Sequence, residues 1–270
     1  MNRFDRLIRR LSMAEKRPGV FLGGAGEGGV GGEARLYGGL VAAQATMAAQ
    51  HTVDDFPLHS LHAYFLGPGR AELDITYHVT TIKNGRNFHA RRVEAWQGEE
   101  CIFQLISSFQ RNEKGVEHQP EMPGCEPPER LPNRDELKGR RHWEDMPVDV
   151  RMVTDITAGQ ARPAEQKVWL RANGNIPDDP KLHIALVVYA SDRGLLDTAF
   201  RPHADQGELI GASLDHAMWF HEQPNFNDWL LYETEGPVAK NARGLATGRI
   251  FDKQGNCLIS VAQEGLLRVR

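Results

Sequence analysis

The chain has 270 residues, of which 40% are hydrophobic and 25% charged, and its net charge is −4. This composition is typical of a soluble globular protein, and the absence of a basic excess argues against nucleic acid as the main partner. The length is sufficient for one large domain or two small ones, each with its own core.

The three cysteines are Cys101, Cys125 and Cys257. Because they are widely separated and odd in number, they predict neither a disulfide framework nor a metal cluster, and no histidine has a paired ligand spacing with them. We therefore expect no metal and a reducing compartment, the cytoplasm. The sequence contains no apolar run of membrane-spanning length.

The first 19 residues are basic, lack an apolar signal core and indicate an amphipathic helix. A glycine tract, Gly23–Gly32, follows the strand-like "GVFLGG". Its Gly24-x-Gly26-x-x-Gly29 spacing nominally fits a dinucleotide fingerprint. No run of parallel βαβ units follows it, so we interpret the tract as a flexible loop.

The rest of the chain repeats one pattern. An apolar helix over residues 38–50 is followed by the strand "SLHAYFL" and by a hairpin turning near Gln97-Gly98. Later in the chain, an apolar helix over 181–193 is followed by "SLDHAMWFH" and by a hairpin turning near Gln254-Gly255. Matches of Ser60 with Ser213 and of Cys101 with Cys257 keep a nearly constant spacing. Such self-similarity indicates a duplication.

A helix that is apolar on nearly all of its faces must be covered by other parts of the protein. One such helix followed by hairpins predicts an α+β fold in which an antiparallel sheet wraps around the helix in each half. The segment between the halves is rich in proline and charge, with one short helix expected near Asp135. We therefore expect an N-terminal half at 17–111, a linker at 112–146 and a C-terminal half at 147–270.

From Tyr37 onward the sequence resembles the acyl-CoA thioesterase II family, which is built as a double hotdog. The matching pieces, in chain order, are "YGGLVAAQA", "HSLHAYFLGPG", "GRNFHARRV", "SFQ", "VWLRANG", "YASD", "SLDHAMWFH", "WLLYETE", "ARG" and "VAQEGLLR". The resemblance implies a tandem hotdog fold, an acyl-CoA substrate, no cofactor, and thioester hydrolysis without a covalent enzyme intermediate. The glycine tract matches the family less well, and its place ahead of "YGGLVAAQA" suggests a flap near the acyl-CoA entrance.

The resemblance further implies three catalytic groups: Asp192 in "YASD", Ser213 ahead of the "DH" pair and Gln263 in "VAQEG". Direct attack by water on a thioester needs a proton acceptor, groups that orient the water and donors for the oxyanion. A carboxylate can accept the proton, whereas a hydroxyl and an amide can both donate and accept. The three residues supply one group of each kind.

Asp215 and His216 form a tempting acid–base pair, but adjacent strand residues point to opposite faces. We interpret both as structural or rim groups, and we match His216 with His62 of the first half. In that half Ser60 carries a hydroxyl, but the first helix has no acidic residue, and Ser107 stands where the second half has Gln263. We therefore expect one working site per chain.

Two alternatives stay open. Asp54 and His59 have the spacing of the catalytic pair in hotdog-type enoyl-CoA hydratases, although Phe56 replaces the expected asparagine. A non-catalytic acyl-CoA-binding protein would show the same composition. Because hotdog sheets commonly pair edge to edge, we also expect a homo-oligomer.

Overall fold

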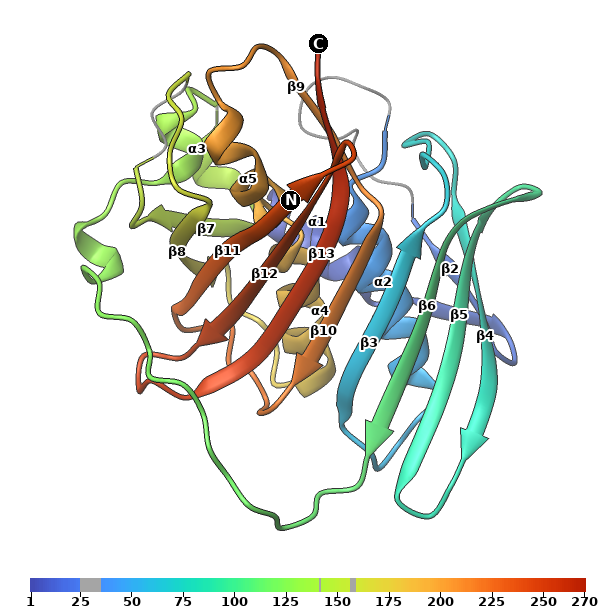
Figure 1. Ribbon diagram of the computed structural model, residues 1–270. Helices are drawn as coiled ribbons and strands as arrows, with labels where there is room; N and C mark the ends of the chain where they lie inside the picture. The colour runs from blue at the N-terminus through green and yellow to red at the C-terminus, as the bar shows by residue number, and fades with distance from the viewer. Residues whose placement is uncertain (25–34, 141, 156–158) are drawn as a thin grey trace.

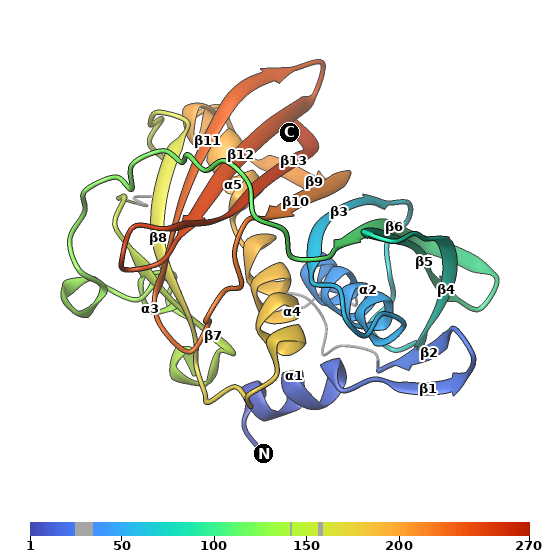
Figure 2. The same cartoon turned by 90° about the horizontal axis from the view of Figure 1, so that it is seen from below.

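The computed structural model describes residues 1–24, 35–140, 142–155 and 159–270 (Figure 1). Most of the glycine tract interpreted above as a flexible loop and entrance flap lies outside these residues. The described chain folds into one large, curved antiparallel sheet with two central helices on its concave side (Figures 1 and 2).

The sheet joins the two halves edge to edge. Its main path runs β1-β2-β4-β5-β6-β3-β10-β13-β12-β11-β8-β7, and β9 pairs with β13. The strands are β1 (Ala14–Arg17), β2 (Val20–Gly23), β3 (Leu58–Phe65), β4 (Ile75–Asn84), β5 (Phe88–Gln97), β6 (Glu100–Gln110), β7 (Val148–Met152), β8 (Glu165–Ala172), β9 (Leu209–Ser213), β10 (Asp215–Phe220), β11 (Leu230–Lys240), β12 (Arg243–Phe251) and β13 (Cys257–Val269).

The expected apolar helices are α2 (Gly38–His51) and α4 (Pro180–Ser191). Most residues of both are buried, and the apolar side chains of both join the main hydrophobic core. The amphipathic N-terminal helix, α1 (Arg3–Leu11), packs on both of them (Figure 2). The remaining α-helices of the described chain are α3 (Arg134–Leu137) in the linker and α5 (Leu195–Phe200) after α4.

The helices α2 and α4 lie antiparallel, side by side (Figure 2). At one end the hydroxyl of Tyr37 donates to the backbone oxygen of Tyr189 at 2.7 Å. At the other end the Lys181 ammonium donates to the backbone oxygen of Gln50 at 2.7 Å. Gly39 allows the close approach, since a Cβ there would lie 2.6 Å from the Tyr189 oxygen. The start of α2 therefore meets the end of α4.

Both expected hairpins are confirmed. The β5–β6 pair turns at Gly98 and the β12–β13 pair turns at Gly255, and both glycines have positive φ values, +61° and +90°. These are left-handed conformations that residues with a Cβ rarely adopt. Glycine at these two positions is therefore part of the turn chemistry.

The residue matches between the halves need a correction. Leu61 lies opposite Ser107 in the β3–β6 pair, and continuing the β10–β13 register by one residue places His216 opposite Gln263. His216 therefore matches Leu61, not His62, and indeed His216 is buried whereas His62 is exposed. Side chains alternate between faces along a strand, so an error of one residue moves the match to the wrong face.

The match of Ser60 with Ser213 is also wrong. Ser60 lies within β3 and pairs with Trp219, whereas Ser213 ends β9 and pairs with Gly265. The extra helix α5 and strand β9 between α4 and β10 have no counterpart between α2 and β3. Spacing along the chain therefore does not give structural equivalence here.

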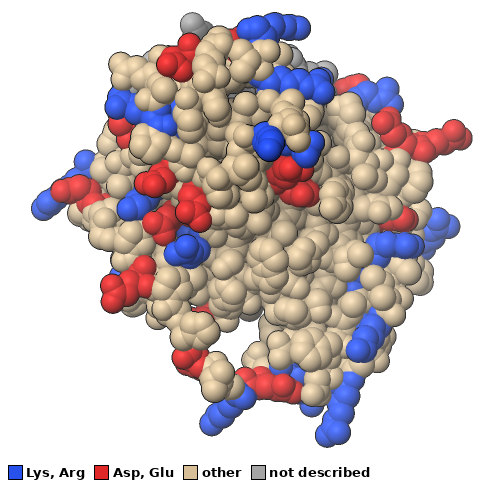
Figure 3. Space-filling model, viewed as in Figure 1, with Lys and Arg blue, Asp and Glu red and all other residues tan. Residues whose placement is uncertain are grey.

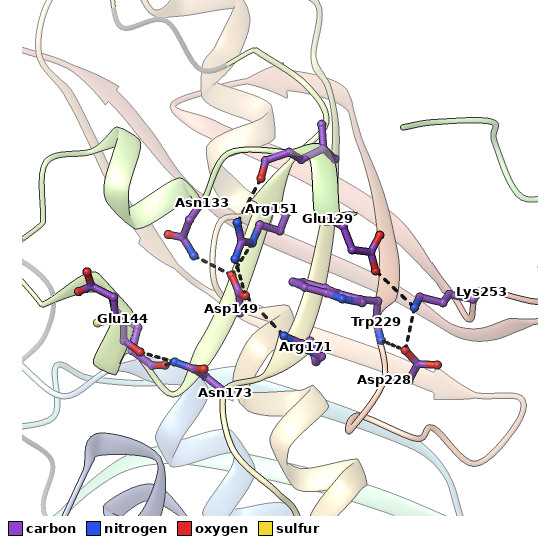
Figure 4. A network of polar contacts seen from close by, with 12 residues as sticks. Glu129, Asn133, Glu144, Asp149, Arg151, Arg171, Asn173, Asp228, Trp229 and Lys253 are labelled. Atoms are coloured by element: carbon purple, nitrogen blue, oxygen red, sulfur yellow. Dashed lines mark hydrogen bonds and ion pairs between the residues drawn. The ribbon is translucent and has the colours of Figure 1, made fainter. Parts of the chain in front are cut away.

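The linker crosses to the far edge of the sheet and packs against the C-terminal half. Its Met122, Cys125 and Leu131 contact a buried cluster that includes Trp169 and Trp229. Figure 4 shows the polar contacts beside this cluster: Asn133 donates to Asp149 at 2.7 Å, and the guanidinium of Arg151 binds both carboxylate oxygens of Asp149 at 2.9 and 3.0 Å. The linker is thus fastened along part of its length.

We keep the division at 17–111, 112–146 and 147–270 as a proposal. Strand β1 begins before the first of these bounds, at Ala14. Among the described residues, no helix is long and apolar enough to cross a membrane.

Candidate active site

Asp192 is the C-cap residue of α4, which ends at Ser191, two residues earlier than the helix end expected from sequence. Its backbone is helical, with φ −70° and ψ −15°, and Gly194 then turns the chain with φ +99° into α5. A carboxylate at a helix C-terminus is opposed by the negative end of the helix dipole. Contacts from other elements must therefore stabilise this carboxylate.

The structure brings the three expected residues together. The Gln263 side-chain amide donates to Asp192 Oδ1 at 2.7 Å, and the Ser213 hydroxyl donates to the same oxygen at 3.3 Å. Gln263 is fully buried in β13, and its Oε1 has no hydrogen-bond partner among the described residues. Gln263 and Ser213 therefore both bind Oδ1 of the carboxylate. The Oε1 atom of Gln263 can still accept a hydrogen bond from a ligand or a water molecule.

The other carboxylate oxygen faces the first half of the chain. A Cβ added to Gly38, the first residue of α2, would lie 3.1 Å from Asp192 Oδ2 and 2.8 Å from the Phe65 ring. The N-cap residue Tyr37 makes no side-chain hydrogen bond that caps α2. The positive end of the α2 dipole thus lies against the Asp192 carboxylate and offsets the dipole of α4.

A cavity of about 460 Å³ opens at this meeting point. The first half contributes Gly38, Phe65 and the start of β6, and the second half contributes Ser213 and neighbouring residues of β9. The lining is largely apolar, as in many sites for small molecules. A ligand here would contact both halves and lie beside the hydroxyl of Ser213.

The aromatic and imidazole groups around Asp192 are uncharged at neutral pH. Burial, and next the negative charge of Asp192, raise the pKa values of Tyr37 and Tyr232 well above 10. Burial lowers the pKa of His216, although Asp192 and Asp215 oppose this effect. Since the Ser191 hydroxyl donates to the Val188 oxygen, His216 Nε2 donates to Ser191 at 2.9 Å.

His216 therefore binds the end of α4 and faces the interior. Asp215 instead accepts from the backbone N–H of Glu264 at 2.6 Å. The two neighbours point to opposite faces, as expected, and do not form an acid–base pair.

The opposite end of the helix pair has different chemistry. Thr52 caps α2 there, in the place that Asp192 takes on α4, and the buried guanidinium of Arg91 donates to its hydroxyl at 2.9 Å and its backbone oxygen at 3.0 Å. Lys181 binds further backbone oxygens of this turn. Arg91 and Lys181 therefore bind the end of α2, where Thr52 stands in the place that Asp192 takes on α4.

The hydratase spacing is not realised as a pair. His59 in β3 contacts the hydroxyl of Ser108 at 2.8 Å, whereas Asp54 is exposed in the loop after α2. Among the described residues, no group of three or more His, Cys, Asp or Glu could hold a metal ion.

Sequence reasoning missed Tyr37 as a neighbour of Asp192 and missed the cationic second end. The signal for Tyr37 was its place directly before the helix, ahead of two glycines, because such a start leaves backbone N–H groups uncapped. No local pattern pointed to Arg91, since its role depends on the register of β5.

Comparison with known proteins agrees with this geometry. A family model described as acyl-CoA thioesterase matches residues 138–266, and one described as the acyl-CoA thioesterase N-terminal domain matches residues 28–110. The chain belongs to the acyl-CoA thioesterase family. The two matched ranges leave residues 111–137 between them, which include the first part of the linker.

The alignments with individual acyl-CoA thioesterases span most of the chain. "Acyl-CoA thioesterase 2" of Haemophilus influenzae is 37% identical over 251 residues, covering 87% of this chain and 88% of the relative. "Acyl-coenzyme A thioesterase 8" of mouse is 35% identical over 259 residues, covering 87% and 81%.

Two solved structures have the same fold. An acyl-CoA thioesterase II from Mycobacterium marinum superposes with a TM-score of 0.84 at 36% identity, covering 98% of each chain. A hotdog-fold protein from Alicyclobacillus acidocaldarius reaches the same TM-score at 15% identity, also covering 98% of each chain. These similarities confirm the expected α+β double hotdog.

Gly38 provides a test of the approach between α2 and Asp192. We expect Gly38→Ala to lower kcat/KM for an acyl-CoA at least about tenfold, because displacement of a reacting group by about 1 Å can cost up to a hundredfold. Helix propensity gives no reason for the melting temperature of Gly38→Ala to fall, since alanine favours the helical conformation more than glycine does. Gly115→Ala is the control, because a Cβ there meets nothing within 4 Å. Wild-type kinetics in Gly38→Ala would show that catalysis does not need the close approach of the start of α2 to Asp192.

The difference between the two ends predicts one site per chain. Ser213→Ala should lower kcat about tenfold or more, because a hydrogen bond to a charged group is worth about 1.5–3 kcal/mol. Ser107→Ala, at the position of the first half that matches Gln263, should change kcat little. Calorimetric titration with a non-hydrolysable acyl-CoA analogue should give one bound molecule per chain. Two equivalent sites, or equal losses from both serine variants, would contradict the asymmetric arrangement.

Proposed function

We propose that this protein is an acyl-CoA thioesterase that hydrolyses the thioester to a free carboxylic acid and CoA. The observation that carries the proposal is the convergence of Asp192, Ser213 and Gln263 beside a largely apolar cavity, with the Ser213 hydroxyl and the Gln263 amide both within 3.3 Å of Asp192 Oδ1. Family membership supports the same substrate class. The acyl chain fits the apolar part of the cavity in this proposal.

In the proposed reaction a water molecule attacks the thioester carbonyl directly. Asp192 is the general base that accepts the proton from water, and its Oδ2 is the oxygen left free by the hydrogen bonds from Gln263 and Ser213 to Oδ1. Ser213 and the free Oε1 of Gln263 orient the water. Both side chains can accept as well as donate hydrogen bonds, which this role needs.

The oxyanion requires donors aimed at the developing charge. We propose that the backbone N–H groups at the start of α2, Gly38 and Gly39, supply them. The helix begins against Asp192, its first turn has no side-chain cap from Tyr37, and glycine lets a ligand approach the backbone closely. One half of the chain then supplies the base and the other half stabilises the charge.

Hydration of an enoyl-CoA finds no support in the geometry, since Asp54 is exposed and His59 contacts Ser108. We place the protein in the cytoplasm, in fatty acid metabolism, on the basis of its cysteine content and substrate class. Neither assignment adds to the chemistry proposed above.

We also propose a homo-oligomer. The outer face of the sheet over β10 and β3 carries few charged side chains, in contrast to the periphery (Figure 3). Tyr64, Ile106 and Trp219 are exposed there by 61%, 52% and 37%. Contiguous exposed apolar surface is typical of association sites, and a second copy of this chain is the partner that we expect.

Asp192→Asn tests the general base. The substitution keeps the size of the side chain and an oxygen that can accept from Gln263, but it removes the proton acceptor. We expect kcat for free-thiol release from an acyl-CoA to fall by about 10²–10⁴-fold. Asp197→Asn on α5, a nearby acid paired with Lys138 at 3.7 Å, is the control and should keep the wild-type rate. An active Asp192→Asn enzyme would make Asp192 an ordinary helix-terminal residue.

A one-step reaction leaves the protein unmodified. Intact-mass measurement during turnover should show no acyl group on Ser213, because the proposed nucleophile is water. A protein species heavier by the mass of the acyl group, and lost in Ser213→Ala, would instead identify Ser213 as a covalent nucleophile.

A further inference from the structure

The turn that carries Asp192 is held from outside by the linker. The Arg193 guanidinium, only 8% exposed, binds Asp135 Oδ1 at 2.6 Å, and Asp135 itself is fully buried in α3. Arg140 binds the same carboxylate oxygen at 3.0 Å. A residue between the two halves thus fixes the side chain next to Asp192.

The backbone of the turn is fixed from the same helix. The buried Arg134 donates from Nη1 to the backbone oxygen of Arg193 at 3.0 Å. A Cβ at Gly194 would lie only 2.6 Å from that nitrogen. Burial, and next the charge of Arg193, lower the pKa of Arg134 to about 10, so it stays charged at neutral pH. Side chain and backbone of Arg193 are therefore both bound by α3.

The helix α3 is anchored in turn to the sheet. Asn133 accepts from the backbone N–H groups of Asp135 and Glu136 at 2.8 and 3.2 Å, and it donates to Asp149 of β7 at 2.7 Å. Arg151 fixes Asp149 and also donates to the backbone oxygen of Leu131 (Figure 4). The contacts form a continuous series from β7 through Asn133 and Asp135 to the turn.

Buried ion pairs are a weak source of net stability, because desolvation of the charges offsets their attraction. Such a pair can instead fix the conformation of the two segments that it joins. Here the charges lie beside the single turn whose geometry the reaction requires. Without the contacts of α3, Gln263 and Ser213 would still bind the Asp192 carboxylate, but the turn that carries it would lose the contacts that fix Arg193.

We propose that Asp135 is a positioning residue, which acts through Arg193 to hold the Asp192 carboxylate against the start of α2. This inference rests on the proposed role of Asp192. It assigns a part in the reaction to a linker residue, and Asp135 lies between the two ranges that match the family models.

A double-mutant cycle tests the proposal. Asp135→Asn should lower kcat for thiol release about tenfold with KM changed less than about twofold, because it loosens the base and not the acyl-CoA contacts. In an Asp192→Asn background the same substitution should change the residual kcat less than about twofold. A residue that only stabilises the fold would lower both rates by the same factor.

The matched control is Thr198→Val in α5. It removes a buried hydrogen bond of 2.7 Å to Thr234 a few residues beyond the turn, without contact to Arg193, and should keep the wild-type kcat. If Asp135→Asn does not fold, Arg193→Lys replaces it, since lysine keeps the charge but loses the planar fork.

Each remaining outcome is decisive. An unchanged kcat in Asp135→Asn, or equal losses in both backgrounds, overturns the positioning role and leaves the proposed function intact. A wild-type rate in Asp192→Asn overturns the proposed function itself, and the inference with it.

Discussion

The pairing of β3 with β10 is the contact on which the rest of the structure depends. It joins two sheets into one and lays α2 antiparallel to α4, so that the start of each helix meets the end of the other. Each helix end is then compensated by the opposite end of its neighbour's dipole. Asp192, unfavourable at the end of its own helix, lies at the start of α2. Lys181, unfavourable at the start of its own helix, binds the end of α2.

This arrangement also explains why the candidate site needs both halves. The second half provides the carboxylate, hydroxyl and amide, whereas the first half provides the helix start and much of the apolar wall. Neither half alone encloses the cavity. The linker adds a third contribution, because α3 binds the turn between α4 and α5 although none of its residues lines the cavity.

The sequence allowed prediction of whatever depends on local periodicity or on the family pattern. The helices α1, α2 and α4, the two glycine hairpins and the convergence of Asp192, Ser213 and Gln263 belong to this group. It did not allow prediction of strand register: His62 was matched with His216, although a difference of one residue places them on opposite faces. Nor did it reveal Arg91 at the second helix end or the contact of Asp135 with Arg193, because both depend on side chains brought together only by folding.

The two ends of the helix pair carry different side chains, and only the end with Asp192 has the added elements α5 and β9. One end has Asp192 and Gln263, and the other has Thr52, Arg91 and Ser107 on an otherwise similar scaffold. A symmetric dimer of identical subunits would have to carry the same residues at both ends, so any change at one would be made at the other. Fusion into one polypeptide removes that restriction. In this molecule one end carries the candidate site, whereas at the other end Lys181 and Arg91 bind the last turn of α2. The side chains at each end, and not the fold, then determine how many sites the chain can have.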